Sequence, residues 1–278
     1  MSSTANPHVG VAFNRPRWLT QRGLTIVSML LLVVGSAFIA GFRQQEWEYP
    51  ITRALNAYAH RSVLLDRTMH ALTARDLLQG VPFVGLIWFL WFAGEDSAIR
   101  GRLLVGTVAA SLAGVVSRVM QLLLPTHLRP LHQSQLDFVL PFGVEPDALN
   151  HFNSFPSDHG AVFFALAAVI WSARPRLGIA AFIWAAVIDL ARVYEGYHFP
   201  SDLTGSIGLG ISVLCLCQPA LPWPPVARVV AFAQTRRSWF YMLAFLFTYM
   251  VATLFDDVRE IVRGMSAVLL HHDVFNGS

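Results

Sequence analysis

The chain of 278 residues is 55% apolar and only 13% charged. This composition is too apolar for a soluble globular domain of that length, and it indicates a polytopic membrane protein. The net charge of +3 comes mostly from arginines in short loops. Because such arginines orient membrane proteins, the charge does not imply a nucleic-acid partner.

All twenty basic residues are arginine, so any site that ordinarily uses a lysine ammonium must use another donor. The two cysteines, Cys215 and Cys217, are two positions apart in an apolar segment. Residues with that spacing face different sides of a helix, so neither a disulfide nor a metal-binding pair is expected.

The N-terminal part of the chain predicts a membrane anchor. Residues 1–23 are polar, contain three arginines and precede an apolar run, 24–42, that is long enough to cross a membrane. A poor cleavage site follows that run. We therefore expect an uncleaved anchor whose N-terminus lies in the cytoplasm.

The segment from residue 46 to residue 79 alternates between apolar and charged residues. Ile51, Leu55 and Tyr58 recur at near-helical spacing, with arginines and acids between them. This pattern is typical of helices that lie along a membrane surface, and we expect them on the outer side.

The rest of the chain contains further apolar runs that predict spanning helices. The runs are 81–93, 103–124, 159–173, 177–194, 203–217 and 239–255. The expected fold is an all-α membrane bundle with a six-span domain over 24–218. A cytoplasmic linker rich in proline and arginine, 219–238, then leads to a seventh transmembrane helix and an amphipathic tail, 239–278.

The distribution of arginine sets the expected topology. With the N-terminus inside, the arginine-rich loops near residues 100, 175 and 230 all fall on the cytoplasmic side, as the positive-inside rule requires. The loops 125–158 and 195–201 then both fall outside. We therefore expect the two stretches that contain the candidate catalytic residues, described next, on one outer face of a bacterial-type plasma membrane.

The first of these stretches is FPSDHG, residues 155–160. Ser157 and Asp158 are strong N-cap residues, and the apolar helix that starts near His159 would direct its free backbone N–H groups toward the loop. An anion would bind there. The alternative interpretation is an ordinary helix cap.

The second stretch is ARVYEGYHFPSD, residues 191–202. His198 lies in a loop and Asp202 begins the next span, so the carboxylate can orient the imidazole and leave its other nitrogen as nucleophile or base. The alternative is a loop salt bridge among Arg192, Glu195 and Asp202. A third stretch, residues 118–130, ends in Arg129-Pro130, and a guanidinium at the mouth of a phosphate site makes bidentate contacts.

These three stretches resemble, in order, the signature motifs of the type 2 phosphatidic acid phosphatase superfamily, which also includes the vanadium haloperoxidases. The family motifs are Lys-x6-Arg-Pro, Pro-Ser-Gly-His and Ser-Arg-x5-His-x3-Asp. The spacing of Arg192, His198 and Asp202 reproduces the third motif, and residues 156–159 match the second with Asp158 in place of glycine. Because haloperoxidases are soluble, the resemblance points to the membrane phosphatases.

The chain departs from the family pattern at the lysine, whose position is occupied by Leu122. Arg118, Gln121 and His127 are the candidates for the missing donor, and we favour Arg118. The alternative for Arg118 is a buried ion pair with Asp189, since charged residues inside a membrane usually have a partner. In the third motif, Ala191 replaces the family's serine.

The resemblance implies a metal-independent phosphatase without a cofactor, in which His198 attacks phosphorus, Asp202 holds its ring and His159 donates a proton to the leaving oxygen. Phosphate would be held by Arg129, Arg192, Ser157, Asp158 and Arg118. The expected substrates are lipids: an isoprenoid pyrophosphate, phosphatidylglycerophosphate or phosphatidic acid. Two alternatives remain open, a lipid phosphotransferase with the same site and an inactive lipid-binding or transport relative. The oligomeric state is open as well.

Overall fold

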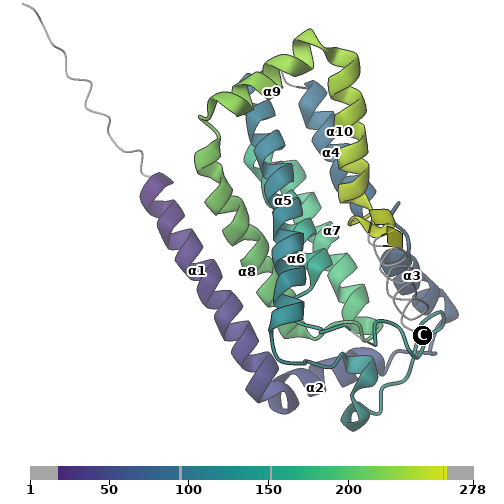
Figure 1. Ribbon diagram of the computed structural model, residues 1–278. Helices are drawn as coiled ribbons and strands as arrows, with labels where there is room; N and C mark the ends of the chain where they lie inside the picture. Colours follow the sequence, from purple (N-terminus) through teal and green to yellow (C-terminus); the bar gives the residue numbers. More distant parts are fainter. Residues whose placement is uncertain (1–17, 94–95, 151, 259, 262–278) are drawn as a thin grey trace, which may run out of the picture.

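The computed structural model describes the chain except residues 1–17, 94–95, 151, 259 and 262–278 (Figure 1). All regular elements in the described part are helices, as the sequence predicts. The α-helices are α1 (Trp18–Phe38), α2 (Gln44–Asn56), α3 (Val63–Ala74), α4 (Gly80–Ala93), α5 (Ser97–Leu123), α6 (Asp158–Ala173), α7 (Pro175–Tyr194), α8 (Pro200–Cys217), α9 (Pro224–Thr235) and α10 (Arg237–Ala252). A π-helical turn (Ile39–Arg43) and short 3-10 turns (Pro130–His132, Ser134–Leu136, Gln218–Ala220) complete the set.

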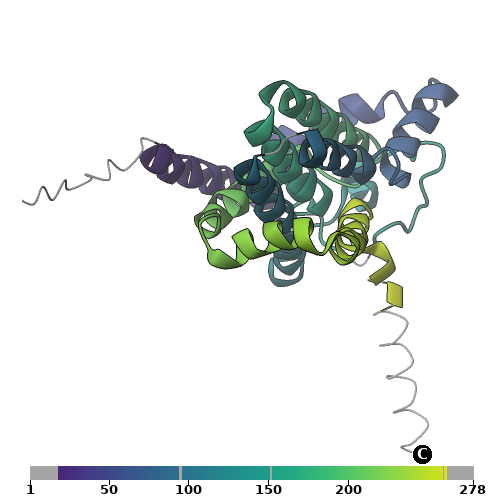
Figure 2. The ribbon, with the colours of Figure 1, turned by 90° about the horizontal axis from the view of Figure 1, so that it is seen from above.

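Helix α6 is the centre of the bundle. It packs against α5, α7, α8 and α4, while α1 lies outside against α8 (Figures 1 and 2). Small residues permit this close packing: a Cβ on Gly210 of α8 would lie 2.4 Å from the carbonyl oxygen of Ala161. In a membrane, where the hydrophobic effect between helices is weak, such contacts are a principal source of helix association.

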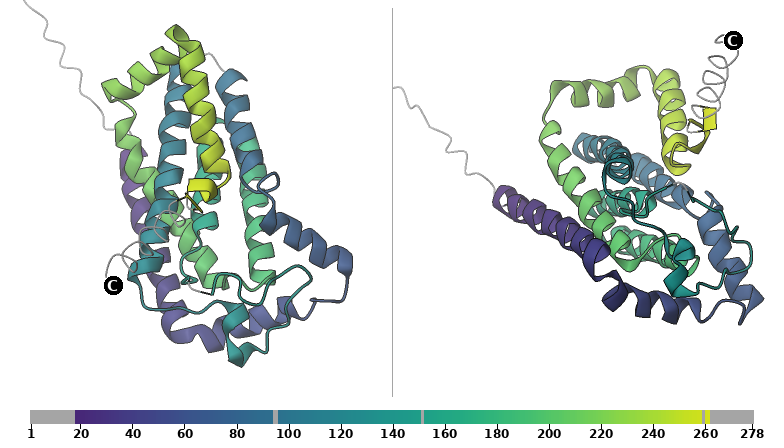
Figure 3. Two further views of the ribbon diagram at one scale, coloured as in Figure 1. Left: turned by 45° about the vertical axis from the view of Figure 1, so that its right-hand side comes forward. Right: turned by 60° about the horizontal axis from the view of Figure 1, so that its bottom comes forward.

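The helices also confirm a multi-pass membrane fold. Among the described residues, four segments are long and apolar enough to cross a membrane: Thr25–Arg43, Ser97–Leu123, Pro175–Tyr194 and Pro200–Ala220. Helices α4 and α6 are shorter and apolar. Helix α10 stands beside α4 (Figure 3). That α10 crosses the membrane as a seventh span stays a prediction.

The helices begin earlier than the apolar runs predict. Helix α5 starts at Ser97, where Asp96 accepts a hydrogen bond from the backbone N–H of Ala98, and α8 starts at Pro200. Capping residues and proline in the first turn favour helix starts at polar positions. For the same reason the expected linker 219–238 is largely helix α9, which has Pro224 at its first position.

The predicted surface helices are α2 and α3, and both lie at one end of the bundle, against α7 (Figure 1). Asn56 of α2 holds the α5–α6 loop, because its side chain donates to the carbonyl oxygen of Val139 at 2.7 Å and accepts from the Val139 N–H at 2.9 Å. The α5–α6 loop, the α7–α8 loop and the first turn of α6 all lie at this end. Of the expected N-terminal segment, 1–23, residues 18–23 form the start of α1 and the rest lies outside the described residues, as does most of the C-terminal tail.

Candidate active site

Two loops and two helix starts meet at the end of the bundle that α2 covers. The backbone N–H of Leu131 in the α5–α6 loop donates to the carbonyl oxygen of Gly196 in the α7–α8 loop at 3.1 Å. Gly196 has a φ of 76°, a conformation that favours glycine. The N–H of Ser157, before α6, donates to the carbonyl oxygen of Asp202 in α8 at 3.4 Å. The three motif stretches, distant in sequence, therefore share one site.

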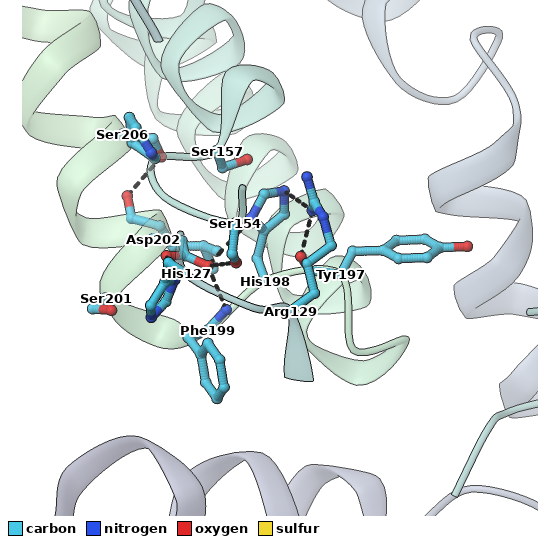
Figure 4. A network of polar contacts seen from close by, with 12 residues as sticks. His127, Arg129, Ser154, Ser157, Tyr197, His198, Phe199, Ser201, Asp202 and Ser206 are labelled. Atoms are coloured by element: carbon cyan, nitrogen blue, oxygen red, sulfur yellow. Dashed lines mark hydrogen bonds and ion pairs between the residues drawn. The ribbon is translucent and has the colours of Figure 1, made fainter. Parts of the chain in front are cut away.

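His198 and Asp202 form the predicted imidazole–carboxylate pair (Figure 4). Nδ1 of His198 lies 3.4 Å from Oδ2 of Asp202, and both side chains are fully buried. The same oxygen accepts hydrogen bonds from the Phe199 N–H at 2.7 Å and from the Ser154 hydroxyl. Because the carboxylate is fixed by these donors, it holds the proton on Nδ1 of His198 and leaves Nε2 with a lone pair.

The surroundings of His198 keep it neutral. Burial, with Arg129 and Arg192 nearby, lowers the pKa of His198 to about 4, although Asp202 acts in the opposite direction. Nε2 lies 3.4 Å from Nη1 of Arg129. With the proton on Nδ1, Nε2 accepts this hydrogen bond from the guanidinium. A phosphate oxygen that takes over the Arg129 N–H frees the Nε2 lone pair to attack phosphorus, while the cation attracts the anionic substrate.

Arg129 joins the loops together. Its guanidinium donates to the carbonyl oxygens of Phe152 at 3.3 Å, Asn153 at 3.1 Å and Tyr197 at 2.5 Å. Burial lowers the pKa of Arg129 to about 10, so the side chain remains a cation at neutral pH. Arg129 therefore positions the loops as well as supplying charge beside His198.

Arg192 does not form the loop salt bridge that the sequence left as an alternative. Within the described chain, no ion pair joins it to Glu195 or Asp202. Glu195 instead contacts Nδ1 of His70 at 3.0 Å and accepts from the Thr73 hydroxyl. Nε of Arg192 is buried without a hydrogen-bond partner among the described residues. An unsatisfied buried donor beside His198 is a natural ligand for a phosphate oxygen.

The FPSDHG stretch contains both the helix cap and a second imidazole–carboxylate pair. Ser157 is the N-cap of α6, and its hydroxyl accepts from the Gly160 N–H at 3.1 Å. Oδ1 of Asp158 lies 2.8 Å from Nδ1 of His159 and accepts from the His159 backbone N–H at 2.9 Å. The carboxylate that replaces the family's glycine is thus directed at the predicted proton donor. Sequence reasoning did not find this pair, although the two residues are adjacent.

Gly160 packs closely against two side chains. A Cβ there would lie 2.2 Å from Oγ of Ser206 and 2.7 Å from Oδ2 of Asp189.

Both carboxylate oxygens of Asp189 lack a hydrogen-bond partner in the part of the chain that the structure describes. The alternative of a hydrogen-bonded Arg118–Asp189 pair is therefore not formed.

The three candidates for the missing lysine occupy different places. Gln121 donates to the carbonyl oxygen of Pro156 at 2.7 Å and so holds the loop before α6. Nδ1 of His127 lies 3.7 Å from Oδ1 of Asp202. Arg118 donates to Oε1 of Gln121 at 2.8 Å and borders a pocket that Asp158 also lines. The assignment of the lysine's role to Arg118 stays a prediction.

The charged residues of the site influence one another. The pKa of Arg129 is shifted by Arg192, Arg118, Asp158 and Asp202 as well as by burial. Arg129 and Arg192 thus lie near His198, and Arg118 of α5 acts on Arg129 and lines a pocket with Asp158. Such a cluster is equipped to bind a phosphate and to place a nucleophile and a proton donor beside it.

Two further residues contribute that the motifs did not indicate. The Ser154 hydroxyl donates to Asp202, and Glu48 of α2 accepts from the Ser201 N–H at 2.7 Å. Glu48 is buried, and burial together with the Asp202 charge raises its pKa to about 7. The sequence did not indicate that Glu48 is a buried acceptor, because a glutamate in a charged, amphipathic helix ordinarily faces water.

Comparison with known proteins supports the resemblance. Residues 101–223 match the PAP2 superfamily, the type 2 phosphatidic acid phosphatases. The chain is 33% identical over 171 residues to YbjG of Escherichia coli (strain K12), whose name provisionally describes it as an undecaprenyl-diphosphatase. That alignment covers 60% of this chain and 77% of YbjG. Undecaprenyl-diphosphatase BcrC of Bacillus subtilis (strain 168) is 22% identical over 165 residues, which cover 59% of this chain and 79% of BcrC.

The fold is also similar to a solved structure, that of a transmembrane PAP2 type phosphatidylglycerolphosphate phosphatase from Bacillus subtilis. The TM-score is 0.50 at 22% identity, over 70% of this chain and 94% of that one. This likeness supports the fold. The identity of 33% over 77% of YbjG, together with the match across residues 101–223, shows that this chain belongs to the PAP2 superfamily.

Proposed function

We propose that this membrane phosphatase hydrolyses an isoprenoid pyrophosphate through a phosphohistidine intermediate. The observation that carries the proposal is the buried, neutral His198 between Asp202 and Arg129, with Arg192 nearby. The names of YbjG, at 33% identity, and BcrC favour an isoprenoid pyrophosphate over phosphatidylglycerophosphate, which the name of the structural neighbour, at 22% identity, suggests.

In the first step, Nε2 of His198 attacks the terminal phosphorus. The P–N bond forms while the P–O bond to the lipid phosphate breaks, and His159 gives its proton to the leaving oxygen. Asp202 stabilises the positive charge that develops on the His198 ring, and Arg129 and Arg192 stabilise the charge on the non-bridging oxygens.

In the second step, neutral His159 takes a proton from water, and the resulting hydroxyl attacks the phosphorus. The P–N bond then breaks, inorganic phosphate leaves and His198 returns to its neutral form. Asp158, which contacts His159 at 2.8 Å, orients the imidazole in both steps.

We further propose that the reaction needs no metal ion and takes place at the outer membrane face. Arginines supply the positive charge that magnesium supplies in many phosphoryl transfers. The outer location is supported by the positive-inside rule applied to the arginine-rich loops at the opposite end of the bundle.

Two alternatives differ from this proposal, one in the acceptor of the phosphoryl group and the other in having no catalytic turnover. A phosphotransferase would use the same phosphohistidine with an acceptor other than water. An inactive lipid-binding relative would have no reason to keep His159, His198 and Asp202.

The decisive measurement is phosphate release by purified protein in detergent with excess chelator. Undecaprenyl pyrophosphate, phosphatidylglycerophosphate and phosphatidic acid are the substrates to compare. We expect release to be fastest from the pyrophosphate and absent in His198→Ala. His132→Ala removes an imidazole that contacts the carbonyl oxygen of Ala148 within the α5–α6 loop, and it should keep activity.

Other results would contradict parts of the proposal. Activity that needs added magnesium would exclude the metal-free mechanism. Consumption of lipid only with an added acceptor would establish a transferase. Acid-labile labelled phosphoenzyme that still forms in His198→Ala would place the nucleophile elsewhere.

A further inference from the structure

Helix α10 and helix α5 face each other across a cleft near the active site. The packing partners of α10 are α4 and α9, so α10 descends from α9 beside α4 (Figure 3). Residues on α5 and α10 together line two pockets, one above the other along the helices. Helix α10 lies beyond residues 101–223, which match the family.

The pocket nearer the active site has a volume of about 230 Å³. Its walls are Val115 and Val119 of α5, Val162 of α6 and Val251 of α10, and its polar border is Arg118 with Asp158. An apolar cavity that ends at a phosphate-site arginine is suited to a molecule with an anionic head and a hydrocarbon tail.

The second pocket continues in the direction of α9. It has a volume of about 340 Å³ and includes Thr107 of α5 and Thr248 of α10. Thr107 lies one helical turn from Ser111, which lines the first pocket, and Thr248 lies about one turn from Val251. The two pockets therefore adjoin along both helices.

The length of this path fits a long tail. From Leu103 to Val119, the limits of the two pockets on α5, the rise is about 24 Å at about 1.5 Å per residue. The hydrocarbon core of a bilayer is about 30 Å thick, so the path covers most of it. Val115 and Leu243, one from each wall, are 55% and 54% exposed, so a tail in the bilayer has access from the side.

We propose that the cleft between α5 and α10 binds the hydrocarbon tail of the lipid substrate while its phosphate lies at Arg118, Arg129 and Arg192. This inference rests on the proposed lipid phosphatase function and adds to it a specificity role for α10. A tail in the cleft anchors the head beside His198, so a long isoprenoid is bound more tightly than a short one.

The test fills the cleft from either wall. Val115→Trp and Leu243→Trp place an indole in the path. Leu112→Trp and Leu246→Trp are matched controls on the same helices, because these leucines are 44% and 49% exposed and line neither pocket. We expect KM for undecaprenyl pyrophosphate to rise at least tenfold in the two cleft variants and less than twofold in the controls. Turnover of the water-soluble p-nitrophenyl phosphate should be unchanged in all four.

Two outcomes would overturn the proposal. One is a rise in KM for the long substrate that is no larger in the cleft variants than in the controls. The other is an equal loss on both substrates, because an obstructed tail site cannot slow a substrate without a tail.

A second measurement uses the unaltered protein and does not depend on turnover. A non-hydrolysable isoprenoid phosphonate with a diazirine in its tail should label peptides of α5 and α10 on irradiation. Equal labelling by a diazirine-tailed phosphatidylcholine would show an ordinary bilayer lipid and contradict the proposal. If the protein hydrolyses none of the lipids but the phosphonate still labels the cleft selectively, the proposed function fails and the tail site stands.

Discussion

His198 lies in an environment that is shielded from water. It is fully buried, and the burial together with Arg129 and Arg192 lowers its pKa to about 4. A histidine kept neutral in this way contributes stability that is present above about pH 6.5 and is lost as the pH falls through about 4. Catalysis by the folded protein is lost as the pH falls through about 4, because a protonated His198 has no lone pair on Nε2.

We therefore predict an acid limb in the pH profile. The value of kcat/KM for p-nitrophenyl phosphate should hold down to about pH 5 and fall below it with a midpoint near 4. Recovery of activity on return to pH 7 controls for denaturation. A limb centred near the ordinary histidine value of about 6.5 would mean that His198 is solvated or is not the nucleophile.

Asp158 replaces the glycine of the family motif, and its contact with His159 gives it a role. The carboxylate lies 2.8 Å from Nδ1 of His159, so it stabilises the protonated ring that donates to a leaving oxygen. The pair repeats, at the start of α6, the arrangement of His198 with Asp202.

For Asp158→Asn we predict a loss that depends on the leaving group. Turnover of an alkyl phosphate should fall at least tenfold, equivalent to about 1.4 kcal/mol of transition-state stabilisation. Turnover of p-nitrophenyl phosphate, whose leaving group departs without a proton, should fall much less. Asp147→Asn, an exposed change in the α5–α6 loop, is the control. Equal losses on both substrates would show that Asp158 acts through binding or folding.

At the scale of the elements, α2 is joined to the site by a hydrogen bond. Glu48 accepts the backbone N–H of Ser201 in the first turn of α8, the turn that contains Asp202. A helix end is stabilised when its free N–H groups find an acceptor. The surface helix therefore helps to fix the start of a spanning helix, and with it the carboxylate that orients His198.

The pKa of Glu48, raised to about 7, makes this contact sensitive to pH. Because the folded state binds the proton more tightly, stability is greatest below about pH 4.5 and declines as the pH rises toward 7, by on the order of 3 kcal/mol. Glu48→Gln keeps an acceptor oxygen without the charge. We predict that it matches the unaltered protein at pH 5 and has a higher Tm at pH 8.

Thermal unfolding in detergent at the two pH values measures this effect. Glu46→Gln is the matched control, since Glu46 lies two positions away on the surface and pairs with Arg43. A Glu48→Gln protein that is destabilised at both pH values would show that the negative charge itself is needed.

At the scale of the whole molecule, the α5–α6 and α7–α8 loops and the surface helices all lie at one end of the bundle (Figure 1). The start of α5, which carries Arg100 and Arg102, and the start of α7, where Arg174 and Arg176 lie, are at the other end (Figure 1). We infer from this asymmetry that the active site is outside the cytoplasm.

Cysteine labelling tests the orientation. In a background in which Cys215 and Cys217 are replaced by alanine, Ser134→Cys, in the α5–α6 loop, should react with an impermeant thiol reagent in intact cells. Ser172→Cys, near the opposite end of α6, should react only after permeabilisation. Both positions are exposed. The reverse pattern would put the site in the cytoplasm.

Much of this architecture could be predicted from the sequence by itself. Long apolar runs in a chain with few charges predict spanning helices. In lipid the backbone must satisfy its own hydrogen bonds, and a helix does so within each segment. The spacing of Arg192, His198 and Asp202 placed an imidazole four residues before a carboxylate at a helix start, and the structure brings these two together at 3.4 Å.

Other features depended on contacts between distant segments, which no local pattern encodes. Three sets of contacts join segments that are far apart in the chain. Glu48 accepts the Ser201 N–H, the Ser154 hydroxyl donates to Asp202, and Arg129 donates to three carbonyl oxygens. The early helix starts and α9 were missed because caps and proline, and not hydrophobicity, set helix ends. The cleft between α5 and α10 exists only because α10 packs on α4 and α9, and packing of this kind is decided by the complete surfaces of the folded helices.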